Sequence, residues 1–373
     1  MINTPNYIGP TCKSYHDAYE RVSHRRRIKF TSPELEHFNN VCISTPVSYR
    51  YKRQKSNIKL INKYSITAEH NSVNLKYVKS ISNCCVVKSD CVLIINGFMD
   101  HYGHCLLDSL PAYEYMRIRY PDRMFLIPKD SPIHDCLLCV DYTYWSKHVI
   151  LYTHNSNYML KCTLTLYDTT TTSWSHRNLN GSEDLINTLK KHTISDNCNR
   201  VIFCPRNQST GGMNGKYQTN SECNMIQDII RGSIKDSHLQ LSTFNPVIDS
   251  GYQPVKDQRN LFHNAHTVIG LKGSAIHNII WSSRFVDSGR KPLNIIEIIP
   301  CNDRLNDIIT PRSNERLYGD YRNRVGDALG SYAQYSDEFN GRWHHVFYNV
   351  KENSDFVYTD LKSLHKLILN TIN

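Results

Sequence analysis

The sequence lacks any apolar run of the roughly 20 residues that a membrane-spanning helix needs. Its first fifteen residues, MINTPNYIGPTCKSY, also lack the apolar core of a signal peptide. From these two absences we expect no transmembrane segment and a cytoplasmic location. The thirteen cysteines are then expected to be reduced and mostly buried, because disulfides are rare in that compartment.

Several familiar site motifs are missing as well. The chain contains no Asp-x-Asp, which disfavours an enzyme that uses this motif to hold a divalent metal on a nucleotide diphosphate. Neither a Walker A lysine loop nor Gly-x-Gly-x-x-Gly occurs, and this argues against P-loop NTPases and simple dinucleotide enzymes.

The composition is that of a globular protein, with 373 residues, 40% hydrophobic and 21% charged. This length predicts about two domains. The net charge of +10 is concentrated early, in the segments 23–30 and 49–64. Such clusters can attract nucleic acid, an anionic membrane surface or an acidic glycan. No nucleic-acid motif accompanies them, so a solvated basic face is the simpler interpretation and nucleic acid is not the expected partner.

Strand and helix patterns alternate after a polar lead-in, 1–65, which we expect to be irregular. The alternation predicts an α/β fold with mostly parallel sheets. A polar break at 195–199 separates an N-terminal domain, 1–195, from a C-terminal domain, 196–350, and a final helical segment, 351–373. The predicted strands are 91–95, 123–128, 148–153, 200–206, 239–244, 266–271 and 293–299. The predicted helices lie near 105–116, 134–140, 183–192, 221–231, 258–265, 276–280 and 356–372.

The stretch QRNLFHNAHTVIGLKGSAIHNIIW, 258–281, contains a buried strand, a tight turn at Lys272-Gly273-Ser274 and a second helix. A residue without a Cβ lets backbone N–H groups approach a ligand closely. The N-terminus of the following helix and the charge of Lys272 would both favour an anion. The pattern is that of a phosphate or pyrophosphate cradle at the carboxyl end of a strand. An ordinary turn between a strand and a helix is the alternative.

Imidazole and carboxylate side chains follow the strand 91–95, at Asp100, His101, His104 and Asp108. His104 and Asp108 are four residues apart and share one helical face. A carboxylate beside an imidazole is a common way to hold a general base ready for proton abstraction. Two alternatives stay open. Asp108 caps a turn beside a hydrogen-bonded core His104, or His101, His104 and Asp108 bind a metal.

Taken together, these stretches resemble family 61 glycosyltransferases over about residues 90–300. The first shared motif, H-x-L-L-D-x-L-P, has its histidine one residue closer than the family's H-x-x-L-L-D-x-L-P and comprises His104, Leu106, Leu107, Asp108, Leu110 and Pro111. The second is a strand ending in Arg206, followed by Asn220 and Glu222 at the start of a helix. The third is similar to Q-x-x-L-F-x-x-A-x-x-V-I-G-x-H-G-A-x-x-x-N with a later strand glutamate, through Gln258, Leu261, Phe262, Ala265, Val268, Ile269, Gly270, Gly273, Asn278 and Glu297.

The resemblance implies a GT-B fold, in which two Rossmann-like domains face a cleft and the last helix packs back on the first domain. It also implies inverting transfer from a UDP-sugar to a glycan or glycoprotein, without a metal or another cofactor. Xylose and N-acetylglucosamine are the implied candidates for the sugar. In this scheme Asp108 is the base and His104 its partner, or the reverse, with His101 and Tyr102 towards the acceptor. The implied donor-binding residues are Arg206, Lys216, Lys272, Gly273, Ser274, Asn278 and Glu297, with Glu297 or Asn278 as a hydrogen-bond partner of the ribose or base.

The sequence departs from the family pattern at several of these positions. Lys272 replaces the usual histidine, Ser274 the following alanine and Ala112 a frequent arginine. Lys272 keeps a cationic donor at the expected diphosphate site but leaves the choice of donor sugar open. Two rival hypotheses follow: a degenerate protein that binds a nucleotide sugar or glycan without turnover, and a basic protein of RNA or membrane surfaces. The absent signal and anchor fit a bacterial or viral enzyme that builds a surface glycan.

Overall fold

A computed structural model gives the fold of the chain. It describes residues 6–7, 35–45, 59–62, 84–95, 102–129, 131–153, 156–168, 182–192, 197–206, 218–248, 251–300, 339–350 and 357–372. The site candidates His101 and Lys216 lie outside the described residues. So do the basic segment 23–30 and most of the segment 49–64.

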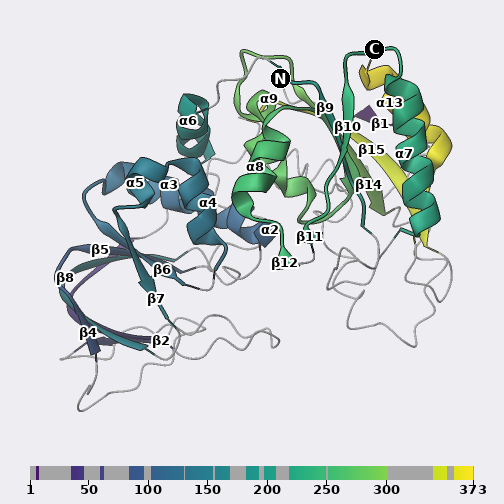
Figure 1. The fold of residues 1–373 in the computed structure, drawn as a ribbon. Coiled ribbons are helices and arrows are strands. Elements are labelled where there is room, and N and C mark those ends of the chain that lie inside the picture. The colour runs from purple at the N-terminus through teal and green to yellow at the C-terminus, as the bar shows by residue number, and fades with distance from the viewer. Residues whose placement is uncertain are drawn as a thin grey trace, which may run out of the picture. The chain divides into compact units, whose positions relative to one another are not determined.

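The chain divides into two compact units. The first unit is formed by residues 30–188, and the second unit by 1–29 together with 189–373. Each unit contains a sheet with seven described strands and has helices packed on it (Figure 1). The mixed α/β class expected from the sequence is therefore confirmed.

The first unit is built on a mostly parallel sheet. In spatial order its strands are β3 (Lys59–Asn62), β2 (Leu35–Thr45), β8 (Ser156–Asp168), β5 (Cys91–Ile95), β6 (Met124–Pro128) and β7 (Val149–Tyr152), with β4 (Cys84–Val87) also paired to β8. Only the pairings of β2 with β8 and with β3 are antiparallel. Strands β5, β6 and β7 follow one another in one direction, whereas β8 lies on the other side of β5. The strand order therefore reverses between β5 and β8.

Three strands of this sheet, β2, β3 and β8, were not predicted. Strand β8 carries apolar side chains at every even position from Tyr158 to Leu166, a period of two that indicates a strand. This signal was overlooked. The expectation of an irregular lead-in is wrong for β2, because its eleven residues pair along nearly the whole length of β8. That partner lies more than 100 residues away in the sequence, so local patterning did not reveal it.

The helices of the first unit are tied together by a buried carboxylate. They are α2 (Tyr102–His104), η1 (Cys105–Ser109), α3 (Leu110–Arg119), α4 (Ile133–Val140), α5 (Tyr142–Trp145) and α6 (Ser182–His192). Glu114 in α3 is fully buried and accepts hydrogen bonds from Arg117 at 2.7 Å, Thr188 at 2.8 Å and Trp145 at 3.1 Å. A buried charge is tolerated only when it is paired in this way. The cluster holds α3, α5 and α6 in one arrangement.

The second unit is an open, doubly wound sheet. Its strands in spatial order are β10 (Gln240–Thr243), β9 (Arg200–Cys204), β13 (Ala265–Leu271), β14 (Leu293–Pro300), β15 (Gly341–Val350) and β1 (Asn6–Tyr7), with β16 (Val357–Thr359) antiparallel to β15. All the other pairings are parallel. From β9, the chain first adds β10 on one side and then β13 on the other. The strand order therefore reverses between β9 and β13, as in doubly wound folds.

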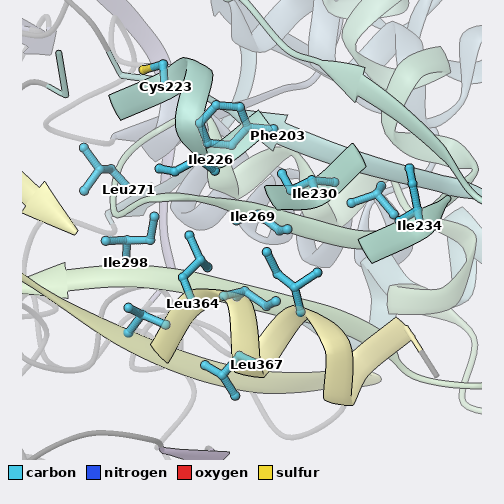
Figure 2. Close-up of a cluster of buried hydrophobic side chains, with 14 of the residues drawn as sticks. Phe203, Cys223, Ile226, Ile230, Ile234, Ile269, Leu271, Ile298, Leu364 and Leu367 are labelled. Atoms are coloured by element: carbon cyan, nitrogen blue, oxygen red, sulfur yellow. The ribbon is translucent and has the colours of Figure 1, made fainter. Parts of the chain in front are cut away.

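Helices cover both faces of this second sheet. Helices α7 (Asn220–Ile234) and α13 (Leu361–Ile372) lie side by side on one face (Figures 1 and 2). On the other face, η4 (Ile276–Trp281) packs Ile276 against Gly270 and α9 (Ser283–Val286) packs Phe285 against Gly341. Helix α8 (Val255–His263) contacts η4. A short hairpin, β11 (Val247–Ile248) and β12 (Gly251–Tyr252), precedes α8.

The C-terminal helix α13 packs on α7, β14 and β15 of the second unit. Leu364, Leu367 and Ile368 form its buried face and lie in one cluster with Ile296 and Ile298 of β14 (Figure 2). The apolar stripe of α13 thus completes the same face that α7 covers.

Within the described residues, no helix is long and apolar enough to cross a membrane.

Candidate functional site

The turn after β13 is fixed to its surroundings by its own backbone and by Arg206. The Lys272 N–H donates to the carbonyl of Ile298 at 3.1 Å and so extends the ladder between β13 and β14 by one bond. Arg206 Nη1 donates to the carbonyl of Lys272 at 3.0 Å. A Cβ placed on Gly273 would lie 3.4 Å from the same nitrogen. The guanidinium group of Arg206 therefore lies directly against the glycine of the predicted cradle.

The strand leading to this turn requires a second glycine. A Cβ on Gly270 would lie 2.8 Å from the carbonyl oxygen of Cys204, 2.9 Å from its Cβ and 3.1 Å from Ile276 Cδ1. Such distances are shorter than van der Waals contact, so any larger residue would push β13 away from β9 or from η4. Gly270 is therefore a packing residue, whereas Gly273 has room around it.

Arg206 and the turn meet at the point where the strand order reverses. Gly270 of β13 is in register with Cys204 of β9, so the two strands end beside each other. Arg206 follows the end of β9, and Lys272-Gly273-Ser274 follows the end of β13. In open α/β sheets, ligands bind outside the carboxyl ends of the strands at such a reversal. The structure thus brings Arg206, Lys272, Gly273 and Ser274 together.

Backbone donors line the turn. The N–H groups of Ile276, His277 and Asn278 donate to the carbonyls three residues before them. For the N–H groups of Gly273, Ser274 and Ala275, no acceptor occurs within the described residues. A helix follows the turn, as expected, and it is a 3-10 helix of six residues, η4. An element this short supplies little of a helix dipole, so anion attraction at the turn must come from Arg206, Lys272 and these N–H groups.

Arg206 is also held from its other side. Its N–H donates to Gln218 Oε1 at 3.3 Å, and its carbonyl accepts from the Gln218 N–H at 2.7 Å. This pair closes the segment that contains Lys216. Further along, Glu222 Oε1 accepts the N–H of Thr359 at 2.7 Å, and burial raises the pKa of the Glu222 carboxyl. Glu222 therefore joins α7 to β16 rather than facing a ligand.

Two expected donor-binding residues are fully buried. Asn278 Nδ2 donates to Gln258 Oε1 at 3.1 Å and to the carbonyl of Ala275 at 3.2 Å. Glu297 lies within β14, where its Oε2 is 4.0 Å from His345 Nε2, and both side chains are fully buried. Burial lowers the pKa of His345 to about 3, so this imidazole is neutral. These placements favour a structural role over direct contact with a ribose.

In the first unit, His104 and Asp108 form a hydrogen-bonded pair. His104 Nδ1 lies 2.7 Å from Asp108 Oδ2, and their side chains are 12% and 17% exposed. The pair lies at the start of η1, a single π-helical turn that leads into α3, and the N–H of Leu110 accordingly donates to the carbonyl of Cys105. Pro111 explains this wide turn, because its ring would clash with the carbonyl of Leu107 in a regular α-helix. The helix predicted near 105–116 is therefore present as η1 followed by α3.

The contact between the pair fixes the chemistry of the imidazole. A carboxylate that accepts the Nδ1–H of His104 leaves Nε2 as the basic nitrogen. Asp108 Oδ2 makes this contact, and Asp108 Oδ1 is buried. His104 is therefore better placed than Asp108 to take a proton from a substrate. Tyr102 begins α2 two residues before His104 and is half-buried.

Other reactive side chains are less suited to chemistry. Burial raises the pKa of the Cys91 thiol to about 12 and also raises those of Cys136 and Cys204. These thiols stay protonated and pack in the core. In the part of the chain that the structure describes, no three His, Cys, Asp or Glu side chains are grouped so as to hold a metal ion.

Comparison with known families gives one match. Residues 102–286 match the family model described as Glycosyltransferase 61. The matched span contains His104 and Asp108 of the first unit and the turn Lys272–Ser274 of the second, and it ends before Glu297. No curated protein matches the chain significantly.

Proposed function

Residues 102–286 place this chain in glycosyltransferase family 61, and on that basis we propose that it transfers a sugar from a UDP-sugar to a glycan or protein-linked glycan. The proposed reaction inverts the anomeric carbon and requires no metal. Xylose and N-acetylglucosamine are the proposed sugars. Family membership supports glycosyl transfer as such, and the finer assignments depend on the residues considered below.

The observation that carries the donor assignment is the placement of Arg206 against the turn after β13, where the strand order reverses. The diphosphate of the donor would lie on the N–H groups of Gly273 and Ser274. Arg206 and Lys272 would offset its charge, with Lys216 as a further cation from the segment that Arg206 and Gln218 close. Charged donors fixed in advance stabilise a leaving group as its charge develops. This arrangement takes the place of a metal ion.

The first unit would supply the base. His104 Nε2 takes the proton of the acceptor hydroxyl while that oxygen attacks the anomeric carbon from the face opposite UDP. The new glycosidic bond forms as the bond to UDP breaks, and UDP leaves with the bonding electron pair. Asp108 orients His104 and stabilises the imidazolium ion. Tyr102 and His101 are the proposed acceptor contacts, and the reverse assignment has Asp108 as the base.

The family further implies a GT-B organisation, in which one α/β unit supplies the donor site and the other the acceptor site. This proposal is supported by the different side chains of the two units: the first has the imidazole–carboxylate pair His104–Asp108, and the second has Arg206 against a glycine turn. Asn278 and Glu297 then belong to the frame of the donor site. A degenerate protein that binds the nucleotide sugar without turnover is the second candidate, because Lys272 stands at the proposed diphosphate position.

The experiment that tests this proposal is thermal denaturation with a panel of nucleotides and nucleotide sugars, with and without EDTA. A ligand that binds only the folded state raises the melting temperature by mass action. We expect stabilisation by UDP and by one UDP-sugar, unchanged by EDTA, followed by transfer of that sugar to a glycan acceptor. Stabilisation without transfer to any acceptor would favour the degenerate binder. No stabilisation by any nucleotide would overturn the donor assignment.

A further inference from the structure

Two buried side-chain amides connect helix α8 to the turn after β13. Gln258 Nε2 donates to the carbonyl of Gln253 at 2.7 Å, just before α8. Asn278 Nδ2 donates to Gln258 Oε1 at 3.1 Å and to the carbonyl of Ala275 at 3.2 Å. Gln258 is 5% exposed and Asn278 is fully buried. The two amides form a continuous chain of hydrogen bonds from α8 to Ala275, the residue that directly follows the turn.

The orientation of both amides is determined by the two ends of this chain. The carbonyls of Gln253 and Ala275 can only accept hydrogen bonds. Gln258 must therefore present its nitrogen to Gln253 and its oxygen to Asn278, and Asn278 must donate in both directions. Turning either amide around would place two acceptors or two donors against each other. Buried networks of this kind rigidify what they connect.

The turn is thus held at both ends by side chains that donate to its carbonyls. At its start Arg206 Nη1 binds the carbonyl of Lys272, and at its end Asn278 Nδ2 binds that of Ala275. Because a trans peptide points its C=O and N–H in opposite directions, a fixed Lys272 carbonyl also fixes the Gly273 N–H. The N–H groups between these two anchors have little freedom to reorient.

We propose that Gln258 and Asn278 are positioning residues for the donor diphosphate. They hold the N–H groups of Gly273, Ser274 and Ala275 in a binding orientation before the ligand arrives, which avoids the cost of ordering the turn on binding. This inference rests on the proposed function. It replaces the ribose contact that the family resemblance implied for Asn278.

The test uses uncharged substitutions of similar size, Asn278→Leu and Gln258→Met, alone and combined. Asn340→Leu is the matched control. Asn340 Nδ2 is also a side-chain amide of the second unit that donates to backbone carbonyls, those of Arg284, Asp287 and Arg290, and it does not touch the turn. Three quantities are measured on the full chain: the melting temperature without ligand, the hydrogen exchange without ligand of the N–H groups that are hydrogen-bonded at the turn (Lys272 and residues 276–278), and the dissociation constant of UDP.

We expect Asn278→Leu and Asn340→Leu to lower the melting temperature similarly. Only Asn278→Leu should accelerate hydrogen exchange at the turn, by at least about fivefold. It should also raise the dissociation constant of UDP by about tenfold. The double variant replaces both partners of the buried amide pair, so part of the lost stability returns. Its UDP affinity stays low, because the Ala275 carbonyl still lacks its side-chain donor and keeps only the backbone N–H of residue 278.

A purely structural role makes the opposite predictions. Exchange of the turn would then be the same in Asn278→Leu and Asn340→Leu, and the UDP affinity of the double variant would recover together with its melting temperature. Either result would overturn the inference. If the wild-type chain does not bind UDP but Asn278→Leu still accelerates exchange in the turn, the donor assignment fails and the anchoring role stands.

Discussion

The strand order reverses in both α/β units, but the side chains that lie beside the reversal differ in their chemistry. In each sheet one early strand is flanked by strands that run off in opposite directions, β5 in the first unit and β9 in the second. In the first unit, the helix after β5 carries an imidazole and a carboxylate joined by a 2.7 Å contact. In the second unit, the ends of β9 and β13 carry a guanidinium group against a glycine turn.

Under the proposed function, strand order selects a location in each unit, whereas the residues after the strands select the reaction step. The pair in the first unit would then transfer protons and depend on two side chains. The turn in the second unit would bind negative charge and depend largely on backbone groups, beside which Arg206 and Asn278 donate to carbonyls. Substitutions in the first unit should therefore change the rate, and those in the second should change donor binding.

The largest expected effect is on the rate, from substitutions in the proton-handling pair. His104→Phe and Asp108→Asn should each lower kcat by at least about 100-fold, the usual contribution of general-base catalysis. His104→Phe should cost at least as much as Asp108→Asn, because the imidazole is the proposed base and the carboxylate its support. Steady-state kinetics with a saturating UDP-sugar measure both. A clearly larger loss in Asp108→Asn would reverse the two roles.

The next effect is the acid sensitivity of the second unit. Burial, followed by the charge of Arg342, lowers the pKa of His344 from 6.5 to about 4. Between these two values the unfolded chain binds a proton that the folded chain does not. The free energy of unfolding is therefore highest above pH 6.5 and falls as the pH drops towards 4. For His344 this loss is on the order of 3 kcal/mol.

Denaturant unfolding measured from pH 7 to pH 4 checks this expectation. The variant His344→Gln cannot titrate, so its stability should fall less steeply over the same range than that of the wild type. His345, whose pKa is lowered to about 3 by burial and then by His344, remains in both proteins. Identical slopes for the two proteins would remove His344 as a source of acid sensitivity.

A smaller effect is a difference in stability between alanine substitutions at Gly270 and at Gly273. Gly270→Ala should lower the free energy of unfolding by about 2 kcal/mol, because its Cβ would lie within 3 Å of Cys204. Gly273→Ala should leave stability nearly unchanged. Gly232→Ala in α7 is the control, since no atom lies within 4 Å of the added Cβ, and it should stabilise by roughly 0.5–1 kcal/mol. Equal losses at positions 270 and 273 would contradict the packing role assigned to Gly270.

Sequence patterns predicted the elements whose burial is evident locally. Strands β5, β6 and β13 and helices α4 and α6 were confirmed close to their expected bounds, because each carries its own apolar period. Strand β15 was missed, since His344 and His345 interrupt its apolar run and are buried only through neighbouring strands. The spacing of Ile276, Ile279 and Ile280 fits both helix types, so the 3-10 geometry of η4 was not predictable.

Part of the candidate site could also be predicted from local sequence patterns. The spacing of four between His104 and Asp108 predicted their contact directly. The position of Arg206 against Gly273 followed only once the pairing of β9 with β13 was known. The bond between Gln258 and Asn278 joins residues 20 positions apart on two elements, and no periodicity encodes it. Contacts of this kind depend on tertiary packing, as does the docking of α13.

The central claim is that the second unit binds the donor and the first unit takes the proton. Calorimetric titration of UDP in EDTA tests it most directly, with the wild type, Asp108→Asn and Arg206→Leu. We predict equal UDP affinity for the wild type and Asp108→Asn, and at least about tenfold weaker binding for Arg206→Leu. Unchanged affinity in Arg206→Leu, or an equal loss in Asp108→Asn, would contradict the account.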